Sequence, residues 1–225
     1  MKNLKSLILL ILLFTLNKLT KAQIPVFEEP RHKVVLQNEY VRLLDVHVRP
    51  HDTTLYHRHS IPSAIVFLSR NVTGSQVMGG EINIGQVIPG NTAFADFANK
   101  PVSHRVWNED TSVYHVMDIE IFPRVNTFVC NIINEPAFKL AWDQKNIRAY
   151  NLTIEPGKTS IVKGVNCPHL FILISGSAHS NSADNTQKIN RELKPGDFIW
   201  YPAGLGFEII NDGAVNTDCV LLELK

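Results

Sequence analysis

Two stretches of the 225-residue chain decide its fold, because one repeats the other: Val41–His51 reads VRLLDVHVRPH and Ile147–Gly157 reads IRAYNLTIEPG. Their offset of 106 residues holds into the next apolar run, and an offset of 103 holds near the end of each copy. The matching pairs downstream are Ser69 with Ser175, Asn108 with Asn211 and Glu120 with Glu223. Two copies of one unit of about 85–90 residues account for the length better than one large domain.

The repeated unit has the pattern of a β structure. Short β-branched and aromatic runs alternate with glycine, proline, asparagine and aspartate, which predicts strands with a turn every 8–12 residues or so. Examples of such runs are Tyr40–Val48, Ser63–Ser69, Val113–Phe122, Leu170–Ser175 and Cys219–Leu224. We therefore expect an all-β chain with an N-terminal unit over residues 34–122 and a C-terminal unit over 144–225. Residues 123–143 form the linker between them, and a short helix is expected at roughly 135–145.

The composition excludes several classes of protein. The chain is 44% hydrophobic and 19% charged, with 12 glycines and 12 prolines, which argues against disorder, collagen and coiled coil. The net charge of +1 depends on the first 22 residues, which hold four lysines and no acid, so the remainder carries about −3. No basic block remains, and nucleic-acid binding is not indicated.

Residues 1–22 have the pattern of a secretory signal. Lys2 and Lys5 precede the apolar run Leu7–Leu16, which is shorter than the roughly 20 residues that a membrane span needs. Thr20-Lys21-Ala22 then places small residues before a cleavage point at Gln23. We expect a secreted or periplasmic protein without stable membrane insertion after cleavage. An uncleaved anchor is the alternative.

The three cysteines, Cys130, Cys167 and Cys219, would enter an oxidising compartment on this route. Because three is an odd number, at most one intramolecular disulfide forms and one thiol is left over. The spacing does not fix the pairing.

His57-Arg58-His59 is the sharpest chemical feature of the sequence. On a strand, residues i and i+2 share a face, so both imidazoles point to one spot while Arg58 points away. Neutral imidazoles bind Fe, Mn, Zn or Ni, and His104 lies on a later apolar run that a barrel would bring beside the pair. Alone, a His-x-His pair is as often a solvated or packed pair as a ligand pair.

The residues around these histidines resemble the cupin superfamily. Its first motif runs Gly, five residues, His-x-His, three or four residues, Glu and an apolar strand; here His51 stands at the glycine and Ser63 at the glutamate. Its second motif is Pro-x-Gly-x-x-His-x-x-x-Asn, of which the chain keeps His104 and Asn108.

The C-terminal unit keeps the turns of this frame and loses the ligands. Tyr201–Phe207 retains Pro-x-Gly, whereas the ligand positions hold other residues. Lys163 and Val165 replace the His-x-His pair, His169 replaces the glutamate, and Phe207 replaces the second-motif histidine.

The resemblance implies two tandem double-stranded β-helix barrels of the jelly-roll or cupin type, with one divalent-metal site at His57, His59 and His104. Ser63 leaves the site without a carboxylate, so three imidazoles and water are the expected ligands. Such a site is similar to that of three-histidine cupin dioxygenases and suits a small organic acid or a sugar-derived substrate. A sugar-acid isomerase or lyase is the alternative enzyme, and a carbohydrate-binding or storage-like cupin is the non-enzymatic one.

The other candidate residues receive structural interpretations. His47, His51 and His115 are expected to be surface or packed histidines, and His169 a packed one. Arg42 has a counterpart in Arg148, which favours a structural role over binding of a substrate carboxylate. The expected partner is a small molecule; family resemblance adds a homo-oligomer to the expectations, and neither the substrate nor the metal follows from the sequence.

Overall fold

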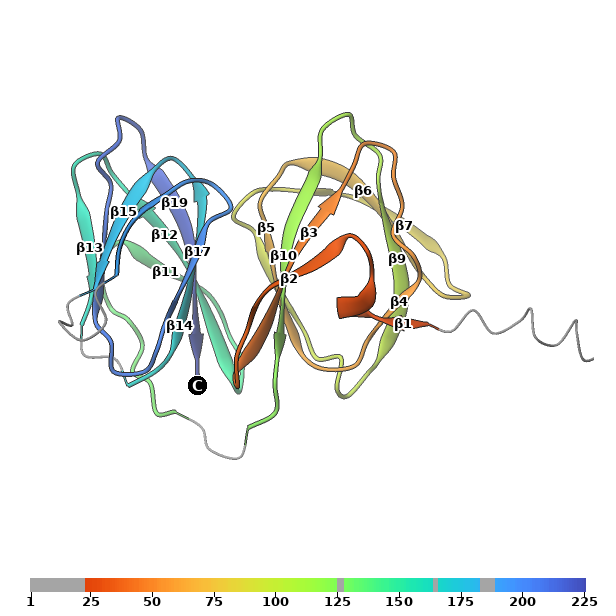
Figure 1. The fold of residues 1–225 in the computed structure, drawn as a ribbon, viewed down its shortest axis with the longest axis horizontal. Coiled ribbons are helices and arrows are strands. Elements are labelled where there is room, and N and C mark those ends of the chain that lie inside the picture. Colours follow the sequence, from red (N-terminus) through yellow and green to blue (C-terminus); the bar gives the residue numbers. More distant parts are fainter. Residues whose placement is uncertain (1–22, 125–127, 164–165, 183–188) are drawn as a thin grey trace, which may run out of the picture.

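The computed structural model describes residues 23–225 except 125–127, 164–165 and 183–188. The predicted signal segment, residues 1–22, lies outside the described residues. Figure 1 shows two lobes of strands side by side, connected at the bottom by the segment that follows β10. No helix in the described ranges has the length and apolarity needed to span a bilayer.

The N-terminal half contains ten strands and one short 3-10 helix in two five-stranded sheets, ordered β1-β4-β9-β6-β7 and β2-β3-β10-β5-β8. Apart from the parallel pair β1–β4, neighbouring strands are antiparallel. The elements are β1 (Ile24–Pro25), η1 (Val26–Glu28), β2 (His32–Gln37), β3 (Val41–Val48), β4 (His57–His59), β5 (Ser63–Phe67), β6 (Asn71–Val77), β7 (Ile82–Val87), β8 (Thr92–Ala95), β9 (Val102–Asn108) and β10 (Tyr114–Ile121).

The C-terminal half repeats this arrangement with a five-stranded sheet, ordered β11-β12-β19-β14-β17, and a four-stranded sheet, ordered β13-β18-β15-β16. Its elements are β11 (Phe138–Asp143), β12 (Ile147–Ile154), β13 (Thr159–Val162), β14 (His169–Ser175), β15 (Ala178–Ser182), β16 (Asn190–Leu193), β17 (Phe198–Tyr201), β18 (Phe207–Ile210) and β19 (Thr217–Leu224). The prediction of an all-β fold is confirmed.

Strand β3 shows how alternation in the sequence builds the core. Val41 and Leu43 point to one face and join a cluster that also contains Leu222 of the other half. Val46 and Val48 point to the opposite face and pack inside the N-terminal half. Since successive side chains of a strand face opposite ways, one strand serves both the interior and the contact between the halves.

The contact between the halves is therefore a hydrophobic core rather than a loose domain interface. It is built from β3, β5 and β10 on one side and from β12, β14 and β19 on the other. A separate cluster fills the inside of the C-terminal half. Burial of apolar area in this cluster stabilises the contact by about 25 cal/mol per Å².

The expectation of a helix at roughly 135–145 was wrong. Residues Phe138–Asp143 form β11, which pairs with β12. Phe138, Leu140 and Trp142 alternate with polar or small residues at the two-residue period of a strand. The C-terminal unit therefore begins before the predicted boundary at residues 143/144, because β11 already belongs to its five-stranded sheet.

The N-terminal half begins before residue 34, with β1 and η1. Glu29, directly after η1, is 1% exposed and fixes this segment to the strands behind it. Its carboxylate accepts hydrogen bonds from the backbone N–H groups of Arg31 at 2.6 Å and Leu55 at 3.1 Å, and it lies 2.8 Å from His32 Nδ1. Burial alone would raise the pKa of Glu29, but these hydrogen bonds together lower it from 4.5 to about 2.

Cys130 and Cys167 form a disulfide, and Cys219 is a buried free thiol. The disulfide ties the segment before β11 to the residues before β14. The odd cysteine is thus packed inside the C-terminal half, where it belongs to the apolar cluster.

Asn108 and Asn211 make the same hydrogen bonds in the two halves. The Asn108 side chain donates to the carbonyl groups of Val48 and Ser112 and accepts from an N–H two residues on. Asn211 donates to the carbonyl groups of Ile154 and Val215 and also accepts from two residues on. Both are at most 1% exposed, so each holds the end of a barrel strand in a place closed to water.

We predict that Asn108→Ala and Asn211→Ala each lower the free energy of unfolding by about 1–3 kcal/mol, because buried carbonyl groups lose their donors. The two sites share no partner, so the double variant should lose the sum of the two effects. Urea unfolding measures these losses, with the exposed Asn151→Ala as the control. A double variant no less stable than either single variant would contradict independent, equivalent roles.

We predict that Glu29 makes the protein sensitive to acid. Its pKa is lower in the folded chain, so its contribution is complete above pH 4.5 and is lost as the pH falls towards 2. The full contribution is on the order of 3 kcal/mol. Thermal unfolding between pH 7 and pH 2.5 should show a steep loss for the wild type. Glu29→Gln should be less stable at pH 7 and show a flatter acid limb; parallel curves would refute the assignment.

Candidate metal centre

Strands β4 and β9 bring the three predicted ligands together. His57 and His59 are 1% and 4% exposed and lie on one face of β4, whereas Arg58 is exposed, as the two-residue period predicts. His104 on β9 is the direct cross-strand partner of His57. Directly opposed residues of an antiparallel pair have Cβ atoms about 4.5–5.5 Å apart, so strand register places the third imidazole beside the first.

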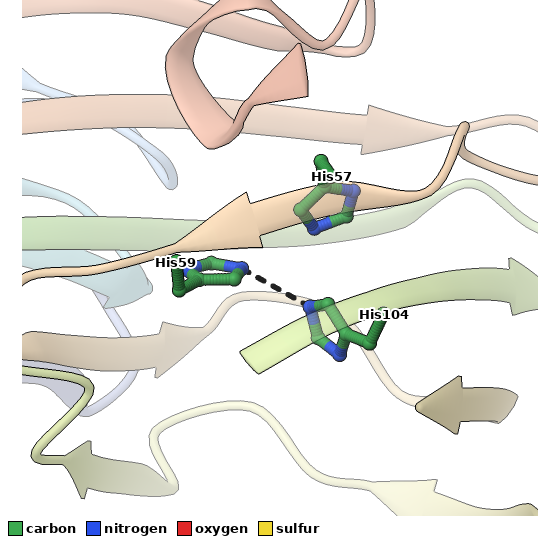
Figure 2. A group of neighbouring side chains, drawn as sticks. All are labelled: His57, His59 and His104. Atoms are coloured by element: carbon green, nitrogen blue, oxygen red, sulfur yellow. Dashed lines mark hydrogen bonds between the residues drawn. The ribbon is translucent and has the colours of Figure 1, made fainter. Parts of the chain in front are cut away.

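Figure 2 shows the three imidazoles converging in the interior of the N-terminal half. Their ring centroids are 4.7–5.1 Å apart, and one nitrogen from each ring lies within 4.8 Å of the other two. The Nε2 atoms of His59 and His104 face each other at 3.0 Å. Three nitrogen donors thus share one small volume.

The second nitrogen of His57 has a partner that selects its tautomer. His57 Nδ1 lies 2.9 Å from the carbonyl oxygen of Leu55, and a carbonyl only accepts, so Nδ1 carries the hydrogen. The lone pair of His57 is therefore on Nε2. This arrangement is the usual one for histidine ligands of metal ions.

A buried carboxylate lies behind His59. Asp118 on β10 is 3% exposed, and its Oδ2 atom is 3.5 Å from His59 Nδ1. Burial raises the pKa of Asp118 to about 7, the negative charge of Glu120 adds to the rise, and Ser63 opposes it in part. This carboxyl group therefore holds its proton to a much higher pH than an ordinary aspartate, and no lysine or arginine of the described residues forms an ion pair with it.

The imidazoles themselves are neutral at physiological pH. Burial lowers the pKa of His57 to about 3, of His59 to about 2 and of His104 to about 4, and charge repulsion from nearby imidazoles adds to the effect. Neutral imidazole is the form that binds metals. Phe97 packs against His59 at 4.6 Å between ring centroids and covers that side of the cluster with an apolar group.

His32 is a fourth histidine at this cluster. Its ring lies 4.7 Å from that of His57, and its Nδ1 is held by Glu29 at 2.8 Å. His32 was not among the predicted site residues because it precedes the predicted start of the barrel at residue 34. Asp118 was not predicted either, although the sequence carries a signal for it: Asp118 and Glu120 place two carboxylates on one face of an apolar strand.

Other predicted residues lie away from the three histidines or are engaged elsewhere. Arg42 binds Glu120 at 2.7 Å, and Arg148 binds Glu223 at 2.6 Å, so this ion pair is part of the repeat.

The C-terminal half has a different interior at the corresponding positions. His169 is fully buried 3.3 Å from Glu223, which agrees with packing, and Phe207 stacks on Tyr201 at 3.7 Å. Lys163 is exposed, and Val165 lies outside the described residues. A cavity of about 670 Å³ lies between residues 129–138 and β13, lined by the C-terminal half and the segment before it. It does not touch the three histidines.

No protein-family model and no curated protein sequence matches the chain. Solved structures do match it. AerE from Microcystis aeruginosa has a TM-score of 0.59 at 11% identity, over 88% of this chain and 98% of its own. Oxalate decarboxylase from Bacillus subtilis, in a study of its Mn(II) centres, has a TM-score of 0.58 at 12% identity, over 83% and 69%.

A cupin 2 conserved barrel protein from Leptotrichia buccalis has a TM-score of 0.56 at 10% identity, over 93% of this chain and 94% of its own. Identities this low establish architecture and not activity. Together with the repeated sheets and the motif histidines inside one of them, they lead to one conclusion: the chain has the cupin fold, as its resemblance to that superfamily predicts.

Proposed function

We propose that the chain is a metal-dependent cupin enzyme that acts on a small organic acid or a sugar-derived substrate, with His57, His59 and His104 as the metal ligands. The observation that carries the proposal is the convergence of three neutral imidazoles in the N-terminal half, with His57 and His59 buried and His104 half-buried. Burying three such groups together costs desolvation energy, which a metal ion would offset.

The residues present fit a divalent ion of Fe, Mn, Zn or Ni. The donor set is all nitrogen, which suits these ions and disfavours calcium and magnesium. His57 already presents the Nε2 lone pair, and His59 Nδ1 has no hydrogen-bond partner among the described residues although Asp118 lies 3.5 Å away. A hydrogen fixed on that nitrogen would be a donor directed at Asp118 and would leave the Nε2 lone pair of His59 free for a metal ion.

A bound ion would supply a Lewis acid with open positions for substrate and water. The protein would supply no negative charge directly to it, because Ser63 replaces the carboxylate of the family motif and Asp118 stands behind His59. A net positive centre favours an anionic substrate. Phe97 would exclude water from one side of the site, which strengthens electrostatic attraction there.

Within this proposal the reaction is dioxygenase-like or is a decarboxylation or isomerisation that needs only a Lewis acid. The similarity in fold to oxalate decarboxylase supports an organic acid as substrate and manganese as one of the ions to test. Oxygen consumption, measured after the protein is loaded with each metal in turn, separates a dioxygenase-like reaction from a Lewis-acid decarboxylation or isomerisation.

A non-enzymatic cupin that binds a carbohydrate is the second candidate. It is favoured by the C-terminal half, which lacks a histidine cluster among its described residues and carries the cavity of about 670 Å³. In this case, ligand-induced thermal stabilisation would survive removal of metals by a chelator.

We also propose that the protein is exported to an oxidising compartment. The apolar N-terminal segment supports this proposal, and so does the disulfide between Cys130 and Cys167, a bond that is rare in reducing compartments. Sequencing the N-terminus of the exported protein tests cleavage before Gln23.

We predict that His57→Ala removes about one equivalent of tightly bound transition metal per chain, because one of three protein ligands is lost. Elemental analysis after metal loading measures the content, and His179→Ala, a histidine of the C-terminal half outside the clusters, is the matched control. Turnover should fall with the metal. If His57→Ala holds as much metal as the wild type, the proposed site is wrong.

We predict that Asp118→Asn has opposite effects on affinity and on stability. Loss of the carboxylate behind His59 should weaken metal binding by about 10–100-fold. In the metal-free protein the raised pKa of Asp118 makes the wild type lose stability as the pH rises from about 4 to about 7. The variant should lack this loss and be more stable at pH 8. A metal affinity equal to that of the wild type would exclude a role at the site.

A further inference from the structure

Asp45, His47 and His115 form a second cluster, outside the interior of the N-terminal half. Asp45 and His47 lie on β3 and His115 lies on β10. Their side chains lie on the same faces of β3 and β10 as those of Val41 and Met117, which pack in the core between the halves. The cluster therefore begins where the apolar contact between the halves ends.

Strand register sets the geometry of this cluster. His47 and His115 are direct cross-strand partners, and Asp45 is two residues from His47 on the same face. The two rings stack with centroids 4.0 Å apart. Oδ1 of Asp45 lies 2.7 Å from His115 Nε2 and 3.6 Å from His47 Nδ1, so both rings direct a nitrogen at the same oxygen.

We propose that Asp45, His47 and His115 form a second divalent-metal site with two nitrogen donors and one carboxylate. One donor atom from each residue lies within 4.8 Å of the other two. Metal–nitrogen and metal–oxygen bonds of about 2.0–2.2 Å place such atoms roughly 3.3 Å apart, which small side-chain rotations achieve here. The ion would replace the proton that His115 now donates to Asp45.

The ring of His115 is held in place before any ion binds. Gly196, in the turn between β16 and β17 of the other half, lies so close that a Cβ atom built on it would be 3.1 Å from His115 Cε1. His47 stacks on one face of the same ring. A ring with neighbours at its edge and on one face loses less rotational freedom when it binds a ligand.

The electrostatics of the cluster also suit a cation. Burial alone would raise the pKa of Asp45, but the hydrogen bond from His115 and the positive charge of Lys33 contribute to lowering it, so the carboxylate is charged. Burial and repulsion from His115 lower the pKa of His47 and keep that imidazole neutral. Lys33 is the other charged group that faces Asp45.

The C-terminal half shows that the fold does not need these histidines. The positions equivalent to Asp45, His47 and His115 by the internal repeat hold Asn151, Thr153 and Asp218. There, Thr153 and Asp218 are cross-strand partners joined by a 2.8 Å hydrogen bond. An ordinary polar contact is enough at this place, and the imidazole pair is particular to the N-terminal half.

The chemical class of the ion follows from the donors. Two imidazoles and one carboxylate suit zinc, cobalt, nickel or copper and disfavour calcium and magnesium. The His47 side chain is 49% exposed and those of Asp45 and His115 are 25% and 22% exposed, so water has access to the remaining coordination positions.

Zinc binding to the folded chain tests this site independently of the barrel site. In a His57→Ala/His104→Ala background, which removes the barrel ligands, titration calorimetry should show one remaining equivalent of zinc. Adding His47→Thr, the residue that the other half uses at this position, should weaken that binding at least about 10-fold. His179→Ala in the same background is the control and should leave binding unchanged.

Asp45→Asn provides a second variant in case His47→Thr disturbs folding, which thermal unfolding detects. Cobalt(II) adds a readout other than affinity, because its visible absorption reports coordination by the imidazoles. The proposal is overturned if the His57→Ala/His104→Ala protein binds no zinc. It is also overturned if adding His47→Thr or Asp45→Asn to that protein leaves its zinc affinity unchanged. Failure of the proposed site at His57, His59 and His104 has a different signature, because the metal content of the His57→Ala single variant would then equal that of the wild type.

Discussion

Strands β3 and β10 are buried on both faces, and this double burial is the constraint on which the rest of the molecule depends. One face of the pair points into the N-terminal half and the other packs against the C-terminal half. A shift of one residue in their register would exchange the two faces. The same alternation then decides where polar residues end up: Asp118 on the inner face stands behind the barrel histidines, and Asp45, His47 and His115 on the outer face form the cluster at the edge of the contact.

The inside of the N-terminal half combines groups that are unfavourable in isolation. Two imidazoles are buried and a third is half-buried beside them, and a carboxyl group is buried behind one of them, so burial shifts all four pKa values in the direction of the neutral form. The equivalent space in the C-terminal half is filled by apolar and aromatic packing around Phe207 and Tyr201. The C-terminal copy thus puts Phe207 in place of the second-motif histidine and pairs its buried His169 with Glu223, whereas the N-terminal copy retains three histidines whose desolvation cost a bound ion would offset.

Much of the fold was predictable because a repeat doubles every local signal. The alternation in Val41–Val48 recurs in Ile147–Ile154, and Asn108 and Asn211 recur with their whole set of hydrogen bonds. The expected helix was wrong because the polar residues around β11 weakened its strand pattern, and pairing with β12 decided its conformation. Within the site, the convergence of the three histidines was predictable from spacing and resemblance. The contacts of Asp118 and His32 were not, since they arise from strands that meet only after folding.

The sequence alone determined the period and the composition of the strands. His57 and His59 share a face because side chains of a strand alternate, and this holds whatever the strand packs against. The tertiary structure decided which residues from distant strands become neighbours. His47 and His115, expected as ordinary surface or packed histidines, stack only because the 67 residues between them return β10 to β3 in this register. The register of two strands depends on the turns and the packing of the whole half, so it cannot be predicted from a local pattern in the sequence.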